Sequence, residues 1–399
     1  MALENRLNKT PLFTFLTNPR LIFWLLVVIT TVVSILQCRF GLSKMGNILI
    51  SKTSFYNLIH HQNMYSFHFT YDGMWIDAFK YSPAFSLLYA PIAILPPTLG
   101  MIAWNLVNVI TFFFAVRSLP FSDAKKALIL GVCLLELILS IQNSQCNLLM
   151  AALMIFAFTA LEKKHILLAT FCVVLSVYIK LFGAVAFILF LFYPDKLKSI
   201  GYTILWSILF FALPLVIVSP TELMQIYHNW GLILKQDAGE AYGLSVMAIA
   251  RAWFGITSAK MYMQLAGAIL LLIPLLSFRS YNNFKFRILY LASILLWVVT
   301  FNHKSESPSF IIAMAGIAIW YVTENASPVN IALLVFAFVL TSLSHSDIIP
   351  TSAAFKANVI DAYIIKGLPA FVMWVVIQTK LYLIAFTPQA SMDRVSIDG

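Results

Sequence analysis

Residues 166–193 read ILLATFCVVLSVYIKLFGAVAFILFLFY, a run in which Lys180 is the single charged side chain. At 1.5 Å per residue, an uninterrupted helix over this run would exceed the roughly 30 Å of hydrocarbon in a bilayer. A lysine in the middle of such a run is costly unless the helix is interrupted there. We therefore predict two short membrane helices that meet at Lys180.

The rest of the chain has the same character. Hydrophobic residues make up 61% of its 399 positions and charged residues 11%, and the mean hydropathy is +0.88. These values are far from those of soluble globular proteins, and only helices satisfy the backbone of such runs inside a bilayer. The sequence predicts an all-α polytopic membrane protein of about twelve transmembrane helices. The apolar runs lie near 20–38, 98–116, 126–141, 146–161, 166–193 (two helices), 198–219, 262–278, 286–301, 308–322, 328–344 and 365–386.

Lysine and arginine residues gather in alternate connections between these runs, and such residues are enriched in cytoplasmic loops. The amino terminus is therefore predicted to be cytoplasmic. In this orientation the apolar segment 82–95 has to dip into the membrane without crossing it. The basic residues concerned are Arg6, Lys9, Arg20, Arg117, Lys125, Lys126, Lys163, Lys164, Lys196, Lys198, Arg279, Lys285 and Arg287.

We interpret residues 1–399 as one integral domain of a multi-pass plasma (inner) membrane protein. The first apolar run has no small-residue cleavage site after it and is read as a retained anchor. The predicted segments are a cytoplasmic stretch 1–19, a first extracytoplasmic loop 39–80 with a helix over 54–61, a second one 220–260, and a tail 387–399.

Composition also argues against several classes of function. The net charge of +10 is interpreted as cytoplasmic loop charge, so no nucleic acid is expected as a partner. Cys38, Cys133, Cys146 and Cys172 have no metal-ligand spacing and are expected to pack. No nucleotide-binding loop of the Walker type is present, and no cofactor is identified.

Unusual polar residues collect on one predicted face. The long first loop, the Gln142–Asn147 segment, Lys180, residues 220–260 and the Asn302–Pro308 segment would all emerge on the extracytoplasmic side. Polar groups at membrane depth usually line a cavity, and long loops are usually functional. We predict one shared extracytoplasmic cavity.

The order of several short motifs carries a resemblance. Phe79-Lys80-Tyr81-Ser82-Pro83-Ala84-Phe85 is followed by Ala90-Pro91, Leu95-Pro96-Pro97 and Trp104-Asn105-Leu106-Val107-Asn108. This string resembles the signature of glycosyltransferase family 87. Gln145-x-Asn147, the helix break at Lys180 and Ser307-Pro308 are similar to later family elements, and the similarity covers residues 40–325.

The resemblance implies a bundle of the GT-C fold and an inverting transfer of a hexose from a polyprenyl-phosphate sugar to a lipid or glycan acceptor. The hexose expected is mannose, as in the characterised members of the family. Membrane lipids would be further partners. The family usually carries an aspartate early in the first loop, and Asn47 stands at the corresponding position. Because an amide does not accept a proton at neutral pH, base catalysis would have to come from another residue.

The catalytic candidates are His303, Glu306 and Asp77, with Asp72 as a further possible base. The ordinary pKa of histidine suits proton abstraction, and Glu306 would orient the imidazole of His303 if that turn is helical. The alternative for Glu306 is a salt bridge with Lys304 or Lys180. A divalent cation, if one takes part, would use Asp72, Asp77 or Glu306.

The substrate-binding candidates are cations for the donor phosphate and amides for sugar hydroxyls. Lys180 is favoured for the phosphate, and snorkelling of its side chain to the interface is the structural alternative. Gln145 and Asn147 would bind hydroxyls or else satisfy a helix end. The full set is Asn47, Lys80, Tyr81, Gln145, Asn147, Lys180 and Lys304.

Two other functions stay open at this point. A secondary transporter or lipid flippase would explain the polar residues within membrane runs, but it is expected to show two similar halves, and no internal repeat is visible. A non-catalytic relative of the GT-C enzymes would explain Asn47.

Overall fold

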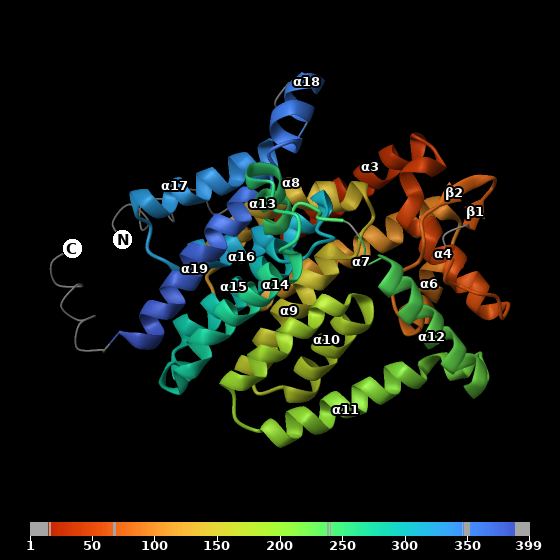
Figure 1. The fold of residues 1–399 in the computed structure, drawn as a ribbon, viewed down its shortest axis with the longest axis horizontal. Coiled ribbons are helices and arrows are strands. Elements are labelled where there is room, and N and C mark those ends of the chain that lie inside the picture. The colour runs from red at the N-terminus through yellow and green to blue at the C-terminus, as the bar shows by residue number, and fades with distance from the viewer. Residues whose placement is uncertain are drawn as a thin grey trace. The chain divides into compact units, whose positions relative to one another are not determined.

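The computed structural model describes residues 15, 17–66, 69–237, 239, 241–344, 346 and 352–387 (Figure 1). The predicted terminal segments fall largely outside these residues. The chain forms two compact units, which are described separately here. Unit 1 comprises Met1–Ala184 and Leu197–Ala241, and unit 2 comprises Val185–Lys196 and Tyr242–Gly399.

Five of the predicted membrane helices of unit 1 come before Lys180. Nearly all of α9 is buried, whereas α3 buries only Leu26, Thr30 and Ser34. A helix that is apolar but makes so little contact with the protein is expected to face lipid. The helices are α3 Pro19–Arg39, α7 Pro97–Ser118, α8 Asp123–Gln142, α9 Asn147–Glu162 and α10 Ile166–Ile179.

The local sequence explains where α3 and α8 begin. The Oδ1 atom of Asn18 accepts the backbone N–H of Arg20 at 2.9 Å, and a proline follows Asn18 in the first turn of α3, where its missing N–H is not needed. Ser122 caps α8 by accepting the N–H of Lys125. Asp123, in the first turn of α8, adds a favourable interaction with the helix dipole.

The predicted break at Lys180 is confirmed. Helix α10 ends at Ile179, Lys180 takes an extended conformation with φ −140° and ψ 124°, and a 3₁₀ helix, η2, runs over Leu181–Phe192. The break brings the start of η2 so close to α10 that a Cβ atom on Gly183 would overlap Ser176. The last eight residues of η2 belong to unit 2, so this helix links the two units in sequence.

The first loop is more ordered than the sequence indicated. It contains a 3₁₀ turn, η1 (Leu42–Met45), helix α4 (Gly46–Ile59), and a hairpin of strands β1 (Phe69–Tyr71) and β2 (Met74–Ile76) with Thr70 opposite Trp75. The helix predicted over 54–61 is therefore the last part of a longer one that begins at Gly46 and ends at Ile59. The turn residues Asp72 and Gly73 have φ of 47° and 76°, as a two-residue hairpin turn requires.

The apolar segment after this loop forms two short helices, α5 (Pro83–Leu88) and α6 (Ala90–Ala93). Helical residues 83–93 extend for only about 16 Å at 1.5 Å per residue, which is less than the thickness of the hydrocarbon core. The segment is too short to cross as a single helix, and its dip into the membrane without crossing stays a prediction.

Unit 1 is completed by two further helices and a 3₁₀ turn. Helix α11 (Lys196–Ala212) passes into η3 (Leu213–Val216) at Pro214, which cannot continue the α-helical hydrogen bonds. Helix α12 (Pro220–Asp237) follows and packs against α5 and η3. It occupies the first half of the predicted second loop.

Unit 2 is centred on α15 (Phe284–Thr300) and α16 (Phe310–Thr323), which pack on each other and are almost wholly buried. Helix α19 (Leu368–Phe386) packs against both. The remaining elements are α13 Val246–Phe254, α14 Lys260–Leu272, η4 Ile273–Leu276, η5 Phe278–Asn282, η6 Ser307–Ser309, α17 Pro328–Ala337, the π-helix η7 Phe338–Leu343, α18 Ala353–Phe355 and the π-helix η8 Lys356–Asp361.

Every predicted apolar run contains a helix. Within the described residues, four helices are long and apolar enough to cross a membrane, and several shorter apolar helices accompany them. The chain is therefore an integral, multi-pass helical membrane protein. The count of about twelve crossings stays a prediction. The four long helices are Pro19–Arg39, Pro97–Ser118, Lys196–Val216 and Leu368–Phe386.

Candidate active site

The break after α10 places Lys180 beside the first turn of α9 in unit 1. The Nζ atom of Lys180 donates a 2.9 Å hydrogen bond to Oδ1 of Asn147, and Nδ2 of Asn147 donates to Oε1 of Gln145 at 2.6 Å. The ring of Phe182 lies 5.8 Å from the same Nζ. An amide and an aromatic ring carry no net negative charge, so these partners hold the ammonium without neutralising it.

Tyr81 and Ser82 of the Phe79–Phe85 motif meet the same region. The Sγ atom of Cys146 lies 3.7 Å from the hydroxyl of Tyr81, and the backbone N–H of Ser82 donates to the carbonyl of Tyr178 at 3.3 Å. The structure thus brings together parts of the chain that are about 100 residues apart. We call Tyr81, Ser82, Gln145, Asn147 and Lys180 the Lys180 junction.

The Trp104-Asn105-x-x-Asn108 motif supports the turn between α8 and α9. The indole of Trp104 donates to the carbonyl of Ser144 at 3.0 Å, and the amide of Asn105 donates to the carbonyl of Ile141 at 3.0 Å. Oδ1 of Asn108 accepts the N–H of Leu149 at 3.2 Å. No role beyond the family resemblance was predicted for these residues, because contacts to backbone groups 36 to 41 residues away leave no local pattern.

Asn47 has a structural contact that an aspartate could not make. It lies at the start of α4, and its Nδ2 donates a 2.8 Å hydrogen bond to the carbonyl of Asn143, at the carboxyl end of α8. A carboxylate has no hydrogen to donate. This contact holds α4 to the same turn that carries Gln145 and Asn147.

Lys80 forms a triad of charges in unit 1. Its Nζ lies 3.1 Å from Asp77 and 3.1 Å from Asp237, and the indole of Trp230 donates to its carbonyl at 3.1 Å. Burial alone would lower the pKa of Lys80, but the hydrogen bond to Asp237 and the charge of Asp77 outweigh it and raise that pKa. Two carboxylates therefore already compensate this cation, and the triad ties the first loop to α12.

His303 lies in unit 2, in the loop after α15. The amide Nε2 of Gln264 lies 3.3 Å from Nδ1 of His303 and 3.2 Å from the carbonyl of Phe301. Because the carbonyl of Phe301 can only accept, the NH₂ group of Gln264 faces both partners. Nδ1 of a neutral His303 then accepts, and the ring proton sits on Nε2.

The helical turn that would pair His303 with Glu306 is absent: residues 302–306 are not helical. The condition for that pairing is therefore not met, since Pro308 lets the helix start only at Ser307. Glu306 is exposed and precedes η6, with its N–H donating to Oγ of Ser309 at 3.3 Å. Lys304 lies near Lys260, whose pKa is lowered by burial and by the charge of Lys304.

The loop that carries His303 rests on Gly243. The carbonyl of Ser305 accepts the N–H of Leu244 at 2.8 Å. Gly243 has φ of 55°, and a Cβ atom there would lie 2.5 Å from the carbonyl oxygen of Ser305. Glycine is therefore required for this close approach. The single cavity that would combine this loop with the Lys180 junction stays a prediction.

In the part of the chain that the structure describes, no group of three or more His, Cys, Asp or Glu side chains could hold an ion. The candidates Asp72 and Asp77 lie at a hairpin turn and in the Lys80 triad. All four cysteines are free thiols.

Comparison with known proteins adds one match. No curated protein matches the chain. Residues 79–344, which include both the Lys180 junction and the loop of His303, match the family model of glycosyltransferase family 87. The match covers well over half of the chain, and membership implies a glycosyltransferase that takes a sugar donor and an acceptor. The chain belongs to glycosyltransferase family 87.

Proposed function

We propose that this protein is an inverting hexosyltransferase that moves a hexose, with mannose as our choice, from a polyprenyl-phosphate sugar to a lipid or glycan acceptor on the extracytoplasmic face of the plasma membrane. Family membership and the apolar helices support an enzyme that acts on a membrane-embedded substrate. The observation that carries the proposal is the hydrogen bond of Lys180 to the neutral amide of Asn147.

Lys180 would hold the phosphate of the donor. As that phosphate leaves the sugar it gains negative charge, and a fixed cation in a site of low dielectric stabilises this charge. The amides of Gln145 and Asn147 would bind sugar hydroxyls or phosphate oxygens. Lys80 is less suited to the same role, because Asp77 and Asp237 already pair with it.

Base catalysis falls to His303 or Asp77 in this proposal, since Asn47 accepts no proton. For His303 to accept a proton at Nε2, its own ring proton has to sit on Nδ1. Gln264 would then have to turn its amide oxygen towards Nδ1 and give up its hydrogen bond to Phe301. Asp77 would first have to leave the ammonium of Lys80.

Two substitutions, one at Gln264 and one at His303, test which residue is the base. A glutamate at 264 would accept from Nδ1–H and leave Nε2 free to act as a base, as a carboxylate does in catalytic triads. If His303 is the base, Gln264→Glu should retain or raise kcat, and His303→Ala should abolish it. A Gln264→Glu variant that loses activity while His303→Ala keeps it would assign the base to another residue.

Transfer of label tests the function itself. Purified protein in proteoliposomes would be given radiolabelled polyprenyl-phosphate mannose together with lipids extracted from membranes as acceptors. Label should move to an acceptor, and Lys180→Ala should slow transfer by about a hundredfold, as expected for loss of a group that stabilises developing charge. Lys44→Ala, at an exposed lysine in η1, is the matched control. Full activity of Lys180→Ala would contradict the site, and transfer from no polyprenyl-phosphate hexose would contradict the function.

One observation favours a second candidate. The amide of Asn47 makes a contact that a carboxylate cannot make, and the resemblance implies an aspartate at this position. A non-catalytic relative that binds the donor without transferring the sugar would have this property. It would bind labelled donor in the same proteoliposomes and show neither transfer nor hydrolysis.

A further inference from the structure

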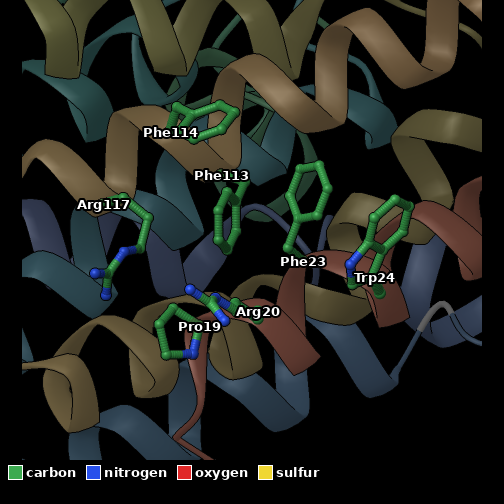
Figure 2. A pocket seen from close by; sticks show the side chains of 7 residues that line it. All are labelled: Pro19, Arg20, Phe23, Trp24, Phe113, Phe114 and Arg117. Atoms are coloured by element: carbon green, nitrogen blue, oxygen red, sulfur yellow. The ribbon is translucent and has the colours of Figure 1, made fainter.

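A cavity of about 290 Å³ lies in unit 1 where the amino-terminal end of α3 meets the carboxyl-terminal end of α7. Figure 2 shows its lining side chains, with Arg20, Phe23 and Trp24 on α3 and Phe113, Phe114 and Arg117 on α7. None of these residues belongs to the Lys180 junction, the Lys80 triad or the loop of His303.

The aromatic part of the cavity is already packed. The ring of Phe23 lies 5.2 Å from that of Phe113, 5.3 Å from that of Trp24 and 6.0 Å from that of Phe114. Phe113 is buried, while Trp24 and Phe114 are 62% and 51% exposed. These rings form an apolar floor that is open to the surroundings of the protein.

The position of the cavity indicates what surrounds it. Helices α3 and α7 are both long and apolar enough to cross a membrane, and only 17% of the apolar window of α3 is buried within the protein. Their ends therefore lie at a boundary between lipid and water. Tryptophan and arginine are typical of this boundary, where the ring sits among the glycerol groups and the guanidinium reaches the phosphates.

The charged groups favour an anion. Arg20 is exposed, and Arg117 forms an ion pair with Asp123 at 2.5 Å. Two guanidinium groups and one carboxylate leave one net positive charge at the cavity. The backbone N–H groups of Arg20 and Leu21 already donate to Asn18, so the guanidinium groups, and not the helix end, would bind an anion. A further cation, Lys126, lies close enough to Arg117 for their charges to interact.

We propose that this cavity binds a glycerophospholipid with an anionic headgroup. Its phosphate would accept hydrogen bonds from Arg20 and Arg117, since a guanidinium matches the geometry of two phosphate oxygens. The start of an acyl chain would lie on the rings of Phe23 and Phe114. A soluble phosphate would use the arginines alone, and a neutral lipid would use the rings alone. The combination of both selects an anionic lipid.

Lipid-dependent stability tests this proposal. Full-length protein in detergent would be titrated with phosphatidylglycerol, phosphatidylcholine or inorganic phosphate, while the melting temperature and the lipids retained in native mass spectra are recorded. We expect phosphatidylglycerol to raise the melting temperature more than phosphatidylcholine, and inorganic phosphate to have no effect. Equal effects of the two lipids, or a full effect of phosphate alone, would overturn the proposal.

Four variants locate the site. Arg20→Gln should weaken phosphatidylglycerol binding by about tenfold, and Arg20→Gln with Arg117→Gln by more, since each removes a hydrogen bond to a charged group. Asp123→Asn removes the ion pair but keeps both arginines, so it should bind the lipid at least as well as the wild type. Arg39→Gln changes an exposed arginine in the last turn of α3 and should have no effect. Undiminished binding by Arg20→Gln, or an equal loss in Arg39→Gln, would refute the assignment.

Discussion

Lys180, which follows the last residue of α10, donates a 2.9 Å hydrogen bond from its Nζ to Oδ1 of Asn147, the first residue of α9. The same amide donates to Gln145, so the orientation of its oxygen towards the lysine is fixed. The ammonium is held in place by a group that does not neutralise it. Such a cation keeps its attraction for a phosphate.

A carboxylate in place of this amide should block the site. In Asn147→Asp the new negative charge would pair with Lys180 and repel a phosphate, so the KM for polyprenyl-phosphate mannose should rise by roughly tenfold or more. Steady-state transfer at varied donor concentration measures this change. Asn143→Asp, in the same turn but with its side chain on Leu139, is the control. An unchanged KM in Asn147→Asp would mean that Lys180 does not bind the donor.

Asn47→Asp should destabilise unit 1. The substitution removes the hydrogen bond to the carbonyl of Asn143 and sets two oxygen atoms against each other, at a cost of about 1 kcal/mol or more. Thermal unfolding followed by intrinsic fluorescence would show a lower melting temperature. In Asn63→Asp the side chain still accepts the N–H of Tyr65, so this control should melt like the wild type. A melting temperature of Asn47→Asp at or above that of the wild type would contradict the contact.

The Lys80 triad predicts that the protein loses stability at alkaline pH. The pKa of Lys80 is raised in the folded protein above its ordinary value of 10.5, so the folded state binds this proton more tightly than the unfolded state. The stabilisation is therefore complete below pH 10.5 and is lost as pH rises through the folded pKa. The difference in melting temperature between wild type and Lys80→Met should stay constant up to that pH and then shrink. If the difference in melting temperature instead grew with pH, the pKa of Lys80 would not be raised in the folded protein.

Gly243→Ala should disturb the loop of His303. The new Cβ atom would lie 2.5 Å from the carbonyl oxygen of Ser305, and alanine is also strained at φ 55°. We expect the two effects together to lower the free energy of unfolding by roughly 2–3 kcal/mol. Gly255→Ala is a matched control, because Gly255 has φ of 66° but nothing within 4 Å; it should cost only about 1 kcal/mol. Unfolding of both variants in urea measures the difference. Equal losses would show that backbone strain alone accounts for the effect.

The sequence predicted those features that depend on local composition. One charge within a long apolar run was enough to predict the interruption at Lys180, and hydropathy was enough to predict where the helices lie. The hairpin over 69–76 was not predicted, although the Asp72-Gly73 pair between β-prone residues is a strong signal for one.

Features that depend on contacts between distant residues were out of reach. The polar side chains of Trp104, Asn105 and Asn108 act on backbone groups of the α8–α9 turn, and hydropathy gives no information on such contacts. The pairing of His303 with Glu306 depended on a helical turn that the chain does not adopt. The role of Gln264 beside His303 depends on two segments that are 39 residues apart.

The 3₁₀ form of η2 affects how far this part of the chain reaches. Twelve residues extend about 24 Å at the 2.0 Å rise of a 3₁₀ helix, but only about 18 Å in α-helical form. If η2 crosses the membrane, as the sequence predicts, winding it into an α-helix would shorten it by about 6 Å, and the surrounding bilayer would have to thin to match. The protein should therefore respond to bilayer thickness through this segment, with short-chain lipids favouring the wound form and long-chain lipids the stretched one.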